Sequence, residues 1–401
     1  MGKASILGLP LLLLSCGDFF GRKTRLDFIE VPQYDNALIA YVPLLPYWEG
    51  FEMPTDFCIG YDELIYVADS GAGQIICLDQ AGRRLGSFRL PGVHAVAQDR
   101  RLDLLAAAPK DTLIGGQLYR LEAIYRIRLA GSQGYGLAQA RIVNTLVHPF
   151  YFKSTFALSD TAVRFRRIKV LGDNSYLVTR NGRDNDPAKF GGPDDAVLRF
   201  RSTDEWQEAI TVQTSTGERP DFFQGVWGLA VPAHPPQSPF VSRRENFWVG
   251  LTAPGLPIKI HAIVPKEGEQ GQFYESEARW APEDPRLADG FITTPGRLGR
   301  PEGLAITTES RPYLVVADAE KDSVYVFTLS GLEGVLPPGL EGVVPPPAAS
   351  SRRPVRVSFG GRGKGPLQLN RPTAVAHYKK VLYVLDAGNK RMLRLRLTTD
   401  F

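Results

Sequence analysis

The chain has 401 residues, and 47 Lys and Arg residues against 43 Asp and Glu residues give it a formal charge of +4. Hydrophobic residues make up 43% of the chain and aromatic residues 10%, which is enough for a large core and excludes a wholly disordered protein. The basic residues are spread along the chain, so no basic patch indicates a nucleic-acid partner. The 40 glycines and 31 prolines fit many short strands joined by turns.

Residues 1–15 have the pattern of a signal peptide. Lys3 is followed by an apolar stretch over residues 4–14, which is too short to span about 30 Å of hydrocarbon but fits a secretory leader. The stretch ends in the letters LLSC, which resemble the bacterial lipobox, with Cys16 as the acylated residue. We therefore expect a lipidated tether over residues 16–23 that anchors the protein in the bacterial cell envelope, in the outer membrane. An ordinary signal peptide and a buried N-terminal helix are the alternatives.

A repeated pattern of strand, Asp-headed turn and strand runs through the chain. No stretch sustains the apolar spacing of a helix, whereas short apolar runs broken by Gly, Asn and Asp recur, which indicates an all-β fold. The aspartates of the repeat are Asp69, Asp318 and Asp386, and each carboxylate is expected to accept turn amides two or three residues later. The three aligned segments are residues 64–71 (LIYVADSG), 313–320 (YLVVADAE) and 381–389 (VLYVLDAGN).

A proline opens another predicted strand upstream of each repeat, and the last of these strands follows residues 359–370 (FGGRGKGPLQLN). The pattern resembles the NHL repeat closely over residues 355–397, and less closely over 295–330 and 53–90. The resemblance implies a β-propeller. Asp69 and Asp318 are 249 residues apart, about four steps of 62, so three divergent blades are expected between them and six in all. We place the divergent blades at residues 91–147, 163–212 and 225–278.

A single propeller domain is therefore expected over residues 24–401. The last predicted blade has three strands before the chain stops, so residues 25–31 are expected to supply its outer strand and to remove an exposed edge. A Pro-rich loop is expected over residues 331–352. It includes the tandem duplication GLEGVLPP–GLEGVVPP at residues 331–346.

The two remaining cysteines, Cys58 and Cys77, are predicted to stay unpaired. They fall on the first and third strands of one blade, and strands about 4.8 Å apart would separate their backbones by roughly 9–10 Å. That separation exceeds the ~7 Å limit for a disulfide.

The central channel is the expected place for a site, because the inner strands of a propeller line it. The residues just before the apolar pair of each inner strand should form a ring at the channel mouth. Such a ring can bind a polar ligand, or it can be a lining that only water fills. If the site is functional, Glu302 is expected as a metal ligand or acid–base group and Arg166 as the partner of an anion. The ring consists of Thr55, His94, Arg166, Trp227, Glu302 and Thr373.

Metal and nucleotide sites find little support in the sequence. Residues 300–304 resemble the PDG segment of the calcium-dependent lactonases of the gluconolactonase type, with Glu302 in place of Asp. The other calcium ligands of that family have no counterparts, and one carboxylate cannot supply the roughly six to eight oxygens that calcium needs. Residues 360–365 resemble a phosphate loop, but Gly365 stands where Ser or Thr is required. We expect no metal and no cofactor.

The histidines do not form a zinc site of the kind found in amidating-lyase propellers. They recur at no common position in the predicted blades, so a three-His site is not expected. The five are His94, His148, His234, His261 and His377.

The function favoured by the sequence is that of a non-catalytic scaffold or accessory subunit. Its expected partner is an envelope protein, peptide or glycan, and its lipid would hold it at the membrane. The alternative is a propeller hydrolase or lyase, similar to lactonases or lyases, with its site at the channel mouth.

Overall fold

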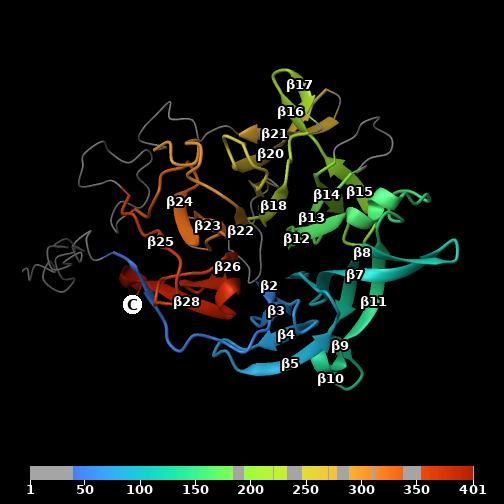
Figure 1. Ribbon diagram of the computed structural model, residues 1–401, viewed down its shortest axis with the longest axis horizontal. Coiled ribbons are helices and arrows are strands. Elements are labelled where there is room, and N and C mark those ends of the chain that lie inside the picture. Colours follow the sequence, from blue (N-terminus) through green and yellow to red (C-terminus); the bar gives the residue numbers. More distant parts are fainter. Residues whose placement is uncertain are drawn as a thin grey trace, which may run out of the picture. The chain divides into compact units, whose positions relative to one another are not determined.

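The computed structural model describes residues 39–183, 194–219, 221–232, 246–269, 271–277, 289–308, 312–336 and 354–400. The chain divides into two compact units, Met1–Tyr34 and Asp35–Phe401, and the first lies outside the described residues. The second is a six-bladed β-propeller with no α-helix among its described residues, which confirms the predicted fold (Figure 1). In the same part of the chain, no helix has the length and hydrophobicity needed to cross a membrane.

Each blade begins with an inner strand beside the channel and continues outward by antiparallel pairing. The strands of the first three blades, from inner to outer, are β2 (Pro54–Ile59), β3 (Ile65–Asp69), β4 (Gln74–Leu78) and β5 (Arg84–Arg89); β6 (Ala95–Gln98), β7 (Leu104–Ile114), β8 (Gln117–Arg128) and β11 (Arg141–Val147); and β12 (Arg164–Val170), β13 (Tyr176–Asn181), β14 (Ala196–Phe200) and β15 (Trp206–Ile210). Those of the last three are β18 (Val226–Ala230), β19 (Phe247–Leu251), β20 (Ile260–Gly268) and β21 (Gly271–Glu277); β22 (Pro301–Ile306), β23 (Tyr313–Asp318), β24 (Ser323–Thr328) and β25 (Phe359–Gly360); and β26 (Pro372–Tyr378), β27 (Val381–Asp386), β28 (Arg391–Leu397) and β1 (Tyr41–Pro43).

The divergent middle blades lie where the sequence placed them, with one difference. Val212 was expected in blade three, but it begins β16 (Val212–Thr214), which pairs in parallel with β21 of blade four. β17 (Gly217–Arg219) then pairs with β16, so blade four has six strands. The remaining short elements are β9 (Ala130–Gly131), β10 (Gly134–Tyr135), η2 (Leu137–Gln139), η3 (Leu158–Ala162), η5 (Ala387–Asn389) and η6 (Thr398–Asp400).

The core consists of apolar clusters between neighbouring blades. Side chains alternate between the two faces of a strand, so each sheet contributes to the cluster on either side of it. In blade one, Tyr66 packs toward blade two and Ile65 packs toward blade six. The inner strands contact one another in cyclic order, and β2 contacts both β6 and β26, which closes the ring.

The outer strand of the last blade comes from the N-terminal side, but it is not residues 25–31. Tyr41–Pro43 (β1) pairs with β28 in the register Tyr41↔Leu397 to Pro43↔Leu395, and an isolated bridge joins Trp48 to Met392. The outer edge of β28 is thus already paired, so the assignment of the closing strand to residues 25–31 is wrong, and those residues lie outside the described part. Closure itself is confirmed: both ends of the propeller chain meet in one sheet (Figure 1).

Asp69 and Asp318 accept turn amides as predicted, whereas Asp386 accepts the side-chain amide of Asn389. Each carboxylate also binds backbone amides of the segment that leads into the inner strand of its own blade, which fixes where that strand begins. The turn bonds are longer, at 3.4 Å from the amide of Ala72 to Asp69 and 3.1 Å from that of Lys321 to Asp318. The bonds to the leading segments run from Glu52 (2.8 Å) and Met53 (2.8 Å) to Asp69, from Gly299 (2.6 Å) and Arg300 (2.8 Å) to Asp318, and from Asn370 (2.7 Å) to Asp386.

Both described cysteines are buried and free, as predicted. Cys58 lies on the inner strand β2 and Cys77 on the third strand β4, with β3 between them. Of the expected Pro-rich loop, residues 331–336 are described, and Val335 forms a bridge with Val355. Residues 337–353 lie outside the described part.

Candidate functional site at the channel mouth

Five of the six ring residues occupy a β-bulge at the start of an inner strand. In blade five, for example, Pro301 pairs with Asp318 and Gly303 with Ala317, which leaves Glu302 unpaired between them. A bulge inserts one residue without a partner and redirects its side chain. The same irregularity falls on Thr55, Arg166, Trp227 and Thr373. In blade two, His94 directly precedes β6 and its amide donates to Ala107.

The six side chains do not all join one cluster. The Thr55 hydroxyl turns back to the carbonyl of Ala68 on its own blade, at 3.2 Å. The Thr373 hydroxyl is buried and has no hydrogen-bond partner among the described residues. The other four, together with Glu122, Arg164 and Arg300, form a charged cluster that we call the mouth cluster.

His94 acts as a clamp within this cluster. Its Nδ1 lies 2.9 Å from the carbonyl of Gly92, and its Nε2 lies 2.8 Å from the carbonyl of Phe165 and 3.0 Å from Glu122 Oε1. Burial opposes the charged imidazolium, but Glu122 and the two carbonyls outweigh it, so the pKa of His94 is raised. Because both ring nitrogens face acceptors, His94 ties blade two to blade three and has no free lone pair for use as a base.

Two arginines gather over one tryptophan. The guanidinium carbons of Arg166 and Arg300 lie 4.0 Å and 5.3 Å from the centre of the Trp227 ring, which is within the range of cation–π attraction. Arg166 also donates from Nε to Asn181 at 2.7 Å. Burial lowers its pKa against the opposing effect of nearby carboxylates, Glu122 and Glu302 among them. Blades three, four and five thus meet at a positively charged, aromatic surface.

Glu302 is the least satisfied charged group of the mouth cluster. Its side chain is 1% exposed, and its Oε1 lies 2.7 Å from a guanidinium nitrogen of Arg300, which itself is 42% exposed. That contact is an ion pair without hydrogen-bond geometry, and neither carboxylate oxygen accepts a hydrogen bond from a described residue. The buried indole nitrogen of Trp227 likewise lacks a partner there. Buried polar groups in folded proteins are normally hydrogen-bonded, so Glu302 and Trp227 are groups of the mouth cluster with hydrogen-bonding capacity left for a polar ligand.

Arg167 links three blades next to the mouth cluster. Its guanidinium donates to the carbonyl of Thr373 at 2.6 Å, and its Nε lies 3.5 Å from Asp56 Oδ1. Asp56 in turn accepts the amide of Val96 at 3.1 Å. One side chain of blade three therefore reaches blades one and six, and it is only 4% exposed.

The mouth cluster does not fit a calcium ion. Glu302 is already paired with Arg300, and three arginines against two carboxylates repel a divalent cation. Among the described residues, no group of three or more His, Cys, Asp and Glu side chains is placed to hold a metal.

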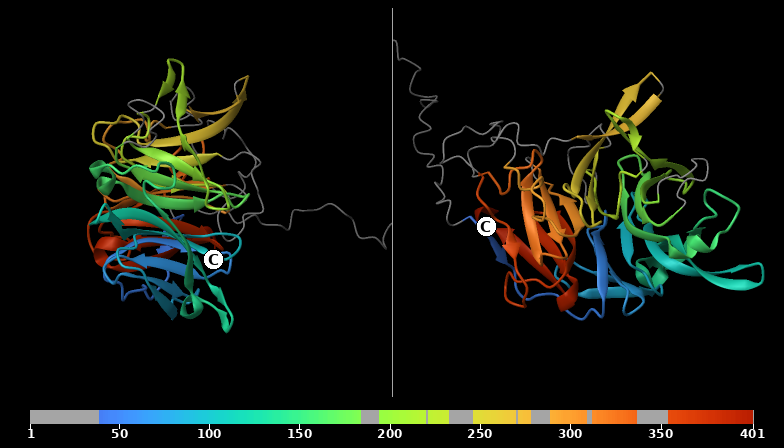
Figure 2. Two further views of the ribbon diagram at one scale, coloured as in Figure 1. Left: turned by 90° about the vertical axis from the view of Figure 1, so that its right-hand side faces the viewer. Right: turned by 45° about the horizontal axis from the view of Figure 1, so that its top comes forward.

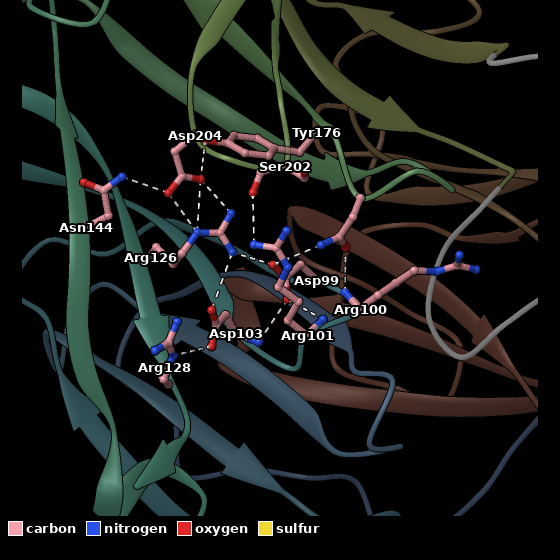
Figure 3. A network of polar contacts seen from close by, with 11 residues as sticks. Asp99, Arg100, Arg101, Asp103, Arg126, Arg128, Asn144, Tyr176, Ser202 and Asp204 are labelled. Atoms are coloured by element: carbon pink, nitrogen blue, oxygen red, sulfur yellow. Dashed lines mark hydrogen bonds and ion pairs between the residues drawn. The ribbon is translucent and has the colours of Figure 1, made fainter.

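A larger network of charges lies at the opposite end of the inner strands and serves as a link between blades (Figure 3). Arg126 on β8 binds Asp204 of blade three through Nε at 2.8 Å and Nη2 at 2.6 Å, and it also contacts Asp99. Asn144 and Tyr176 donate to Asp204 at 2.8 Å and 3.1 Å. The charged and polar groups of this network are paired with one another, which leaves none of them free for a ligand. The network therefore serves to join blades two and three.

A buried histidine and aspartate also lie in the connection between blades two and three. His148 Nε2 is 3.1 Å from Asp160, and its Nδ1 is 3.2 Å from the hydroxyl of Tyr151. His148 and Asp160 are fully buried, and burial lowers the pKa of His148 to about 3. No substrate can reach a side chain with no exposed surface, so the His148–Asp160 pair has a structural role and holds this connection in place.

Several residues at the mouth could not be predicted from the sequence. Glu122 lies on the third strand of blade two and approaches His94 only because β7 and β8 pair. Arg167 was adjacent to a predicted residue, but its partners in blades one and six depend on ring closure. Arg300 was the one residue with a usable signal, because it directly precedes the Pro–Glu–Gly segment of the repeat.

No family model matches the chain, and no curated protein matches it either. Solved structures match over nearly the whole propeller. The PQQ-bound form of aldose sugar dehydrogenase from Streptomyces coelicolor is 14% identical, with a TM-score of 0.51 over 90% of this chain and 98% of that one. A gluconolactonase from Xanthomonas campestris is 12% identical, with a TM-score of 0.49 over 90% and 89% of the two chains. A streptogramin B lyase is 10% identical, with a TM-score of 0.47 over 91% and 100%.

These neighbours are propeller enzymes, and at such identities the likeness concerns the fold alone. The NHL resemblance of the sequence and the six-bladed ring agree on that fold. The function of this chain therefore depends on the residues of its own mouth cluster, and not on the shared fold.

Proposed function

We propose that the protein is a propeller enzyme of the hydrolase or lyase type that acts on a small organic anion at the channel mouth. One observation carries the proposal: the buried Glu302 carboxylate has no hydrogen-bond partner among the described residues and lies beside Arg300. A buried, imperfectly paired carboxylate is costly to stability, and such groups concentrate at functional sites. The solved neighbour with a TM-score of 0.51, an aldose sugar dehydrogenase, is itself an enzyme, and this supports a catalytic function over the scaffold favoured by the sequence.

The chemistry follows from the charges. Arg166 and Arg300 present planar donors that suit a carboxylate or a developing oxyanion. A ligand anion that binds Arg300 competes with Glu302 for the guanidinium, which leaves the Glu302 carboxylate without its counter-charge. Glu302 can then accept a proton, either from carbon in an elimination or from water in a hydrolysis. Trp227 offers an aromatic face and an unpartnered N–H to the same ligand.

The test is an activity screen with a matched variant. Hydrolysis of lactones that carry a carboxylate group is followed by acid release, and elimination from small carboxylates by the absorbance of the conjugated product. For the active substrate, Glu302→Gln should lower kcat/KM by about 100-fold or more, because it removes the proton acceptor. Glu320→Gln, at an exposed residue of the same blade, should leave kcat/KM unchanged. Full activity in folded Glu302→Gln would refute the role of Glu302, and no turnover across the panel would favour the scaffold.

The protein is also proposed to be a lipoprotein of the bacterial envelope, anchored through Cys16. In that setting one feature favours docking of an envelope protein as a second function. The hairpin of β7 and β8 extends beyond its blade (Figure 2), and its cross-strand pair Leu113 and Leu118 is 70% and 64% exposed. Leu113→Lys with Leu118→Lys should abolish co-purification of one defined partner from the native envelope and leave the melting temperature unchanged. Unchanged co-purification would show that the hairpin is not the docking surface.

A further inference from the structure

Beyond the mouth, the channel contains a cavity to which all six inner strands contribute. It has a volume of about 50 Å³, and its lining residues lie two to four positions past the ring residues in each blade. Arg167, one position past its own ring residue, contacts Thr373 and Asp56, which precede the wall residues of their own strands. The wall is almost wholly apolar, with side chains such as Ala230, Ile306 and Val375.

One charged side chain lines this cavity. Lys169 on β12 is half-buried, and no hydrogen bond or ion pair joins its ammonium to a described residue. The nearest carboxylate that acts on it, Asp56, is already engaged by Arg167 and by the amide of Val96. The other polar side chains of the wall are the thiol of Cys58 and the amide of Gln98, and the amide is satisfied by Tyr61 and Asp62.

An ammonium in an apolar cavity needs a counter-charge. Burial lowers the pKa of Lys169, with Asp56 and Cys58 opposing the effect and Arg167 adding to it. Charged groups taken out of water are stable only when they are paired. Since no described residue supplies a partner, a small anion that enters the cavity would gain a full charge pair with Lys169.

The size and the wall define which anion fits. A cavity of about 50 Å³ holds a few water molecules or two to four heavy atoms of a ligand. A carboxylate can pair with the ammonium while a methyl group contacts the apolar wall, and this combination suits the site better than a fully hydrated inorganic ion.

We propose that this cavity is a binding site for a two-carbon carboxylate, held by Lys169 at its charged end and by the apolar wall at its methyl group. The site is separate from the mouth cluster and does not depend on the function proposed there.

The experiment compares three probes at constant pH and ionic strength: sodium acetate, acetamide and sodium chloride. Acetamide has the size of acetate without its charge, and chloride has the charge without the methyl group. Calorimetric titration should show saturable binding of acetate, with binding of acetamide and chloride at least tenfold weaker. Equal binding of acetamide or of chloride would overturn the proposal.

Variants then locate the acetate. Lys169→Met should weaken acetate binding at least tenfold, and Lys364→Met, at an exposed lysine, should leave it unchanged. Ala376→Leu fills the cavity while keeping Lys169, so it should also abolish binding if Lys169→Met proves too unstable to measure. Arg166→Met and Arg300→Met should retain acetate binding. Loss of binding in those two variants with retention in Lys169→Met would place the anion at the mouth and overturn this proposal alone.

Discussion

The carboxylate of Asp318 accepts the backbone amide of Arg300 at 2.8 Å, so an aspartate that heads a turn in blade five also fixes the segment that carries the proposed acid–base group. It accepts the amide of Gly299 as well, at 2.6 Å, and the side chain is fully buried. The repeat aspartate thus connects a local sequence pattern to the geometry of the channel mouth.

Removing this carboxylate should destabilise the propeller. In Asp318→Ala the amides of Gly299 and Arg300 and two turn amides lose their acceptor, and we expect the free energy of unfolding to fall by about 2–4 kcal/mol. Urea denaturation followed by circular dichroism measures the change. Asp111→Ala, at an exposed position of β7, should shift it by less than about 0.5 kcal/mol. A comparable loss of unfolding free energy in the two variants would show that the Asp318 carboxylate does not stabilise the fold more than an exposed aspartate does.

Replacing Arg167 should destabilise the fold for a different reason. Arg167→Met leaves Asp56 buried without its cation and frees the carbonyl of Thr373, and breaking a buried pair on one side typically costs about 3–5 kcal/mol. The double variant Arg167→Met with Asp56→Leu removes the uncompensated charge and should recover a large part of the loss. If the double variant is as unstable as the single one, the charge pair is not the cause.

His94 should make stability depend on pH in a defined direction. Its pKa is raised in the folded state, so its contribution is fully present below the unfolded pKa of about 6.5 and is lost as the pH rises through the folded pKa. The difference in unfolding free energy between the wild type and His94→Gln should therefore be largest near pH 6 and shrink at higher pH. Taking the difference cancels the opposite contributions of His148 and His261, whose pKa values are lowered to about 3 and about 4. A difference that grows with pH would contradict a charged His94.

The two described thiols should be unreactive in the native state. Burial raises the pKa of Cys77 to about 12 and also raises that of Cys58, so neither forms the reactive thiolate near pH 8. A colorimetric thiol reagent should find both cysteines only after unfolding in denaturant. Peptide mapping without reductant should find no bridge between them, and fast native labelling would mean that the blade opens readily.

Cys16 is expected to be the acylated N-terminus of the mature protein. Mass spectrometry of protein purified from native membranes should show a chain that begins at Cys16 and carries lipid. Cys16→Ala should move the protein from the membrane fraction to the soluble fraction without changing its melting temperature. An unmodified chain that begins at another residue would refute the lipoprotein assignment.

The blades could be recognised from local sequence patterns. Strands and Asp-headed turns depend on neighbours within about ten residues, and that is why the repeats at Asp69, Asp318 and Asp386 could be aligned and the six blades counted. The same alignment placed Glu302 and Thr373 at the start of their inner strands, because the bulge recurs at the same position of the repeat.

The tertiary structure decided which strand closes the ring and which charges meet in the channel. Both residues 25–31 and Tyr41–Pro43 precede the first blade, and only the geometry of the β28 edge selects the second. The partners of the mouth come together over long separations: Arg167 donates to Thr373, 206 residues later in the chain. No local pattern encodes such a contact, because it exists only when the ring closes and brings six inner strands to one axis.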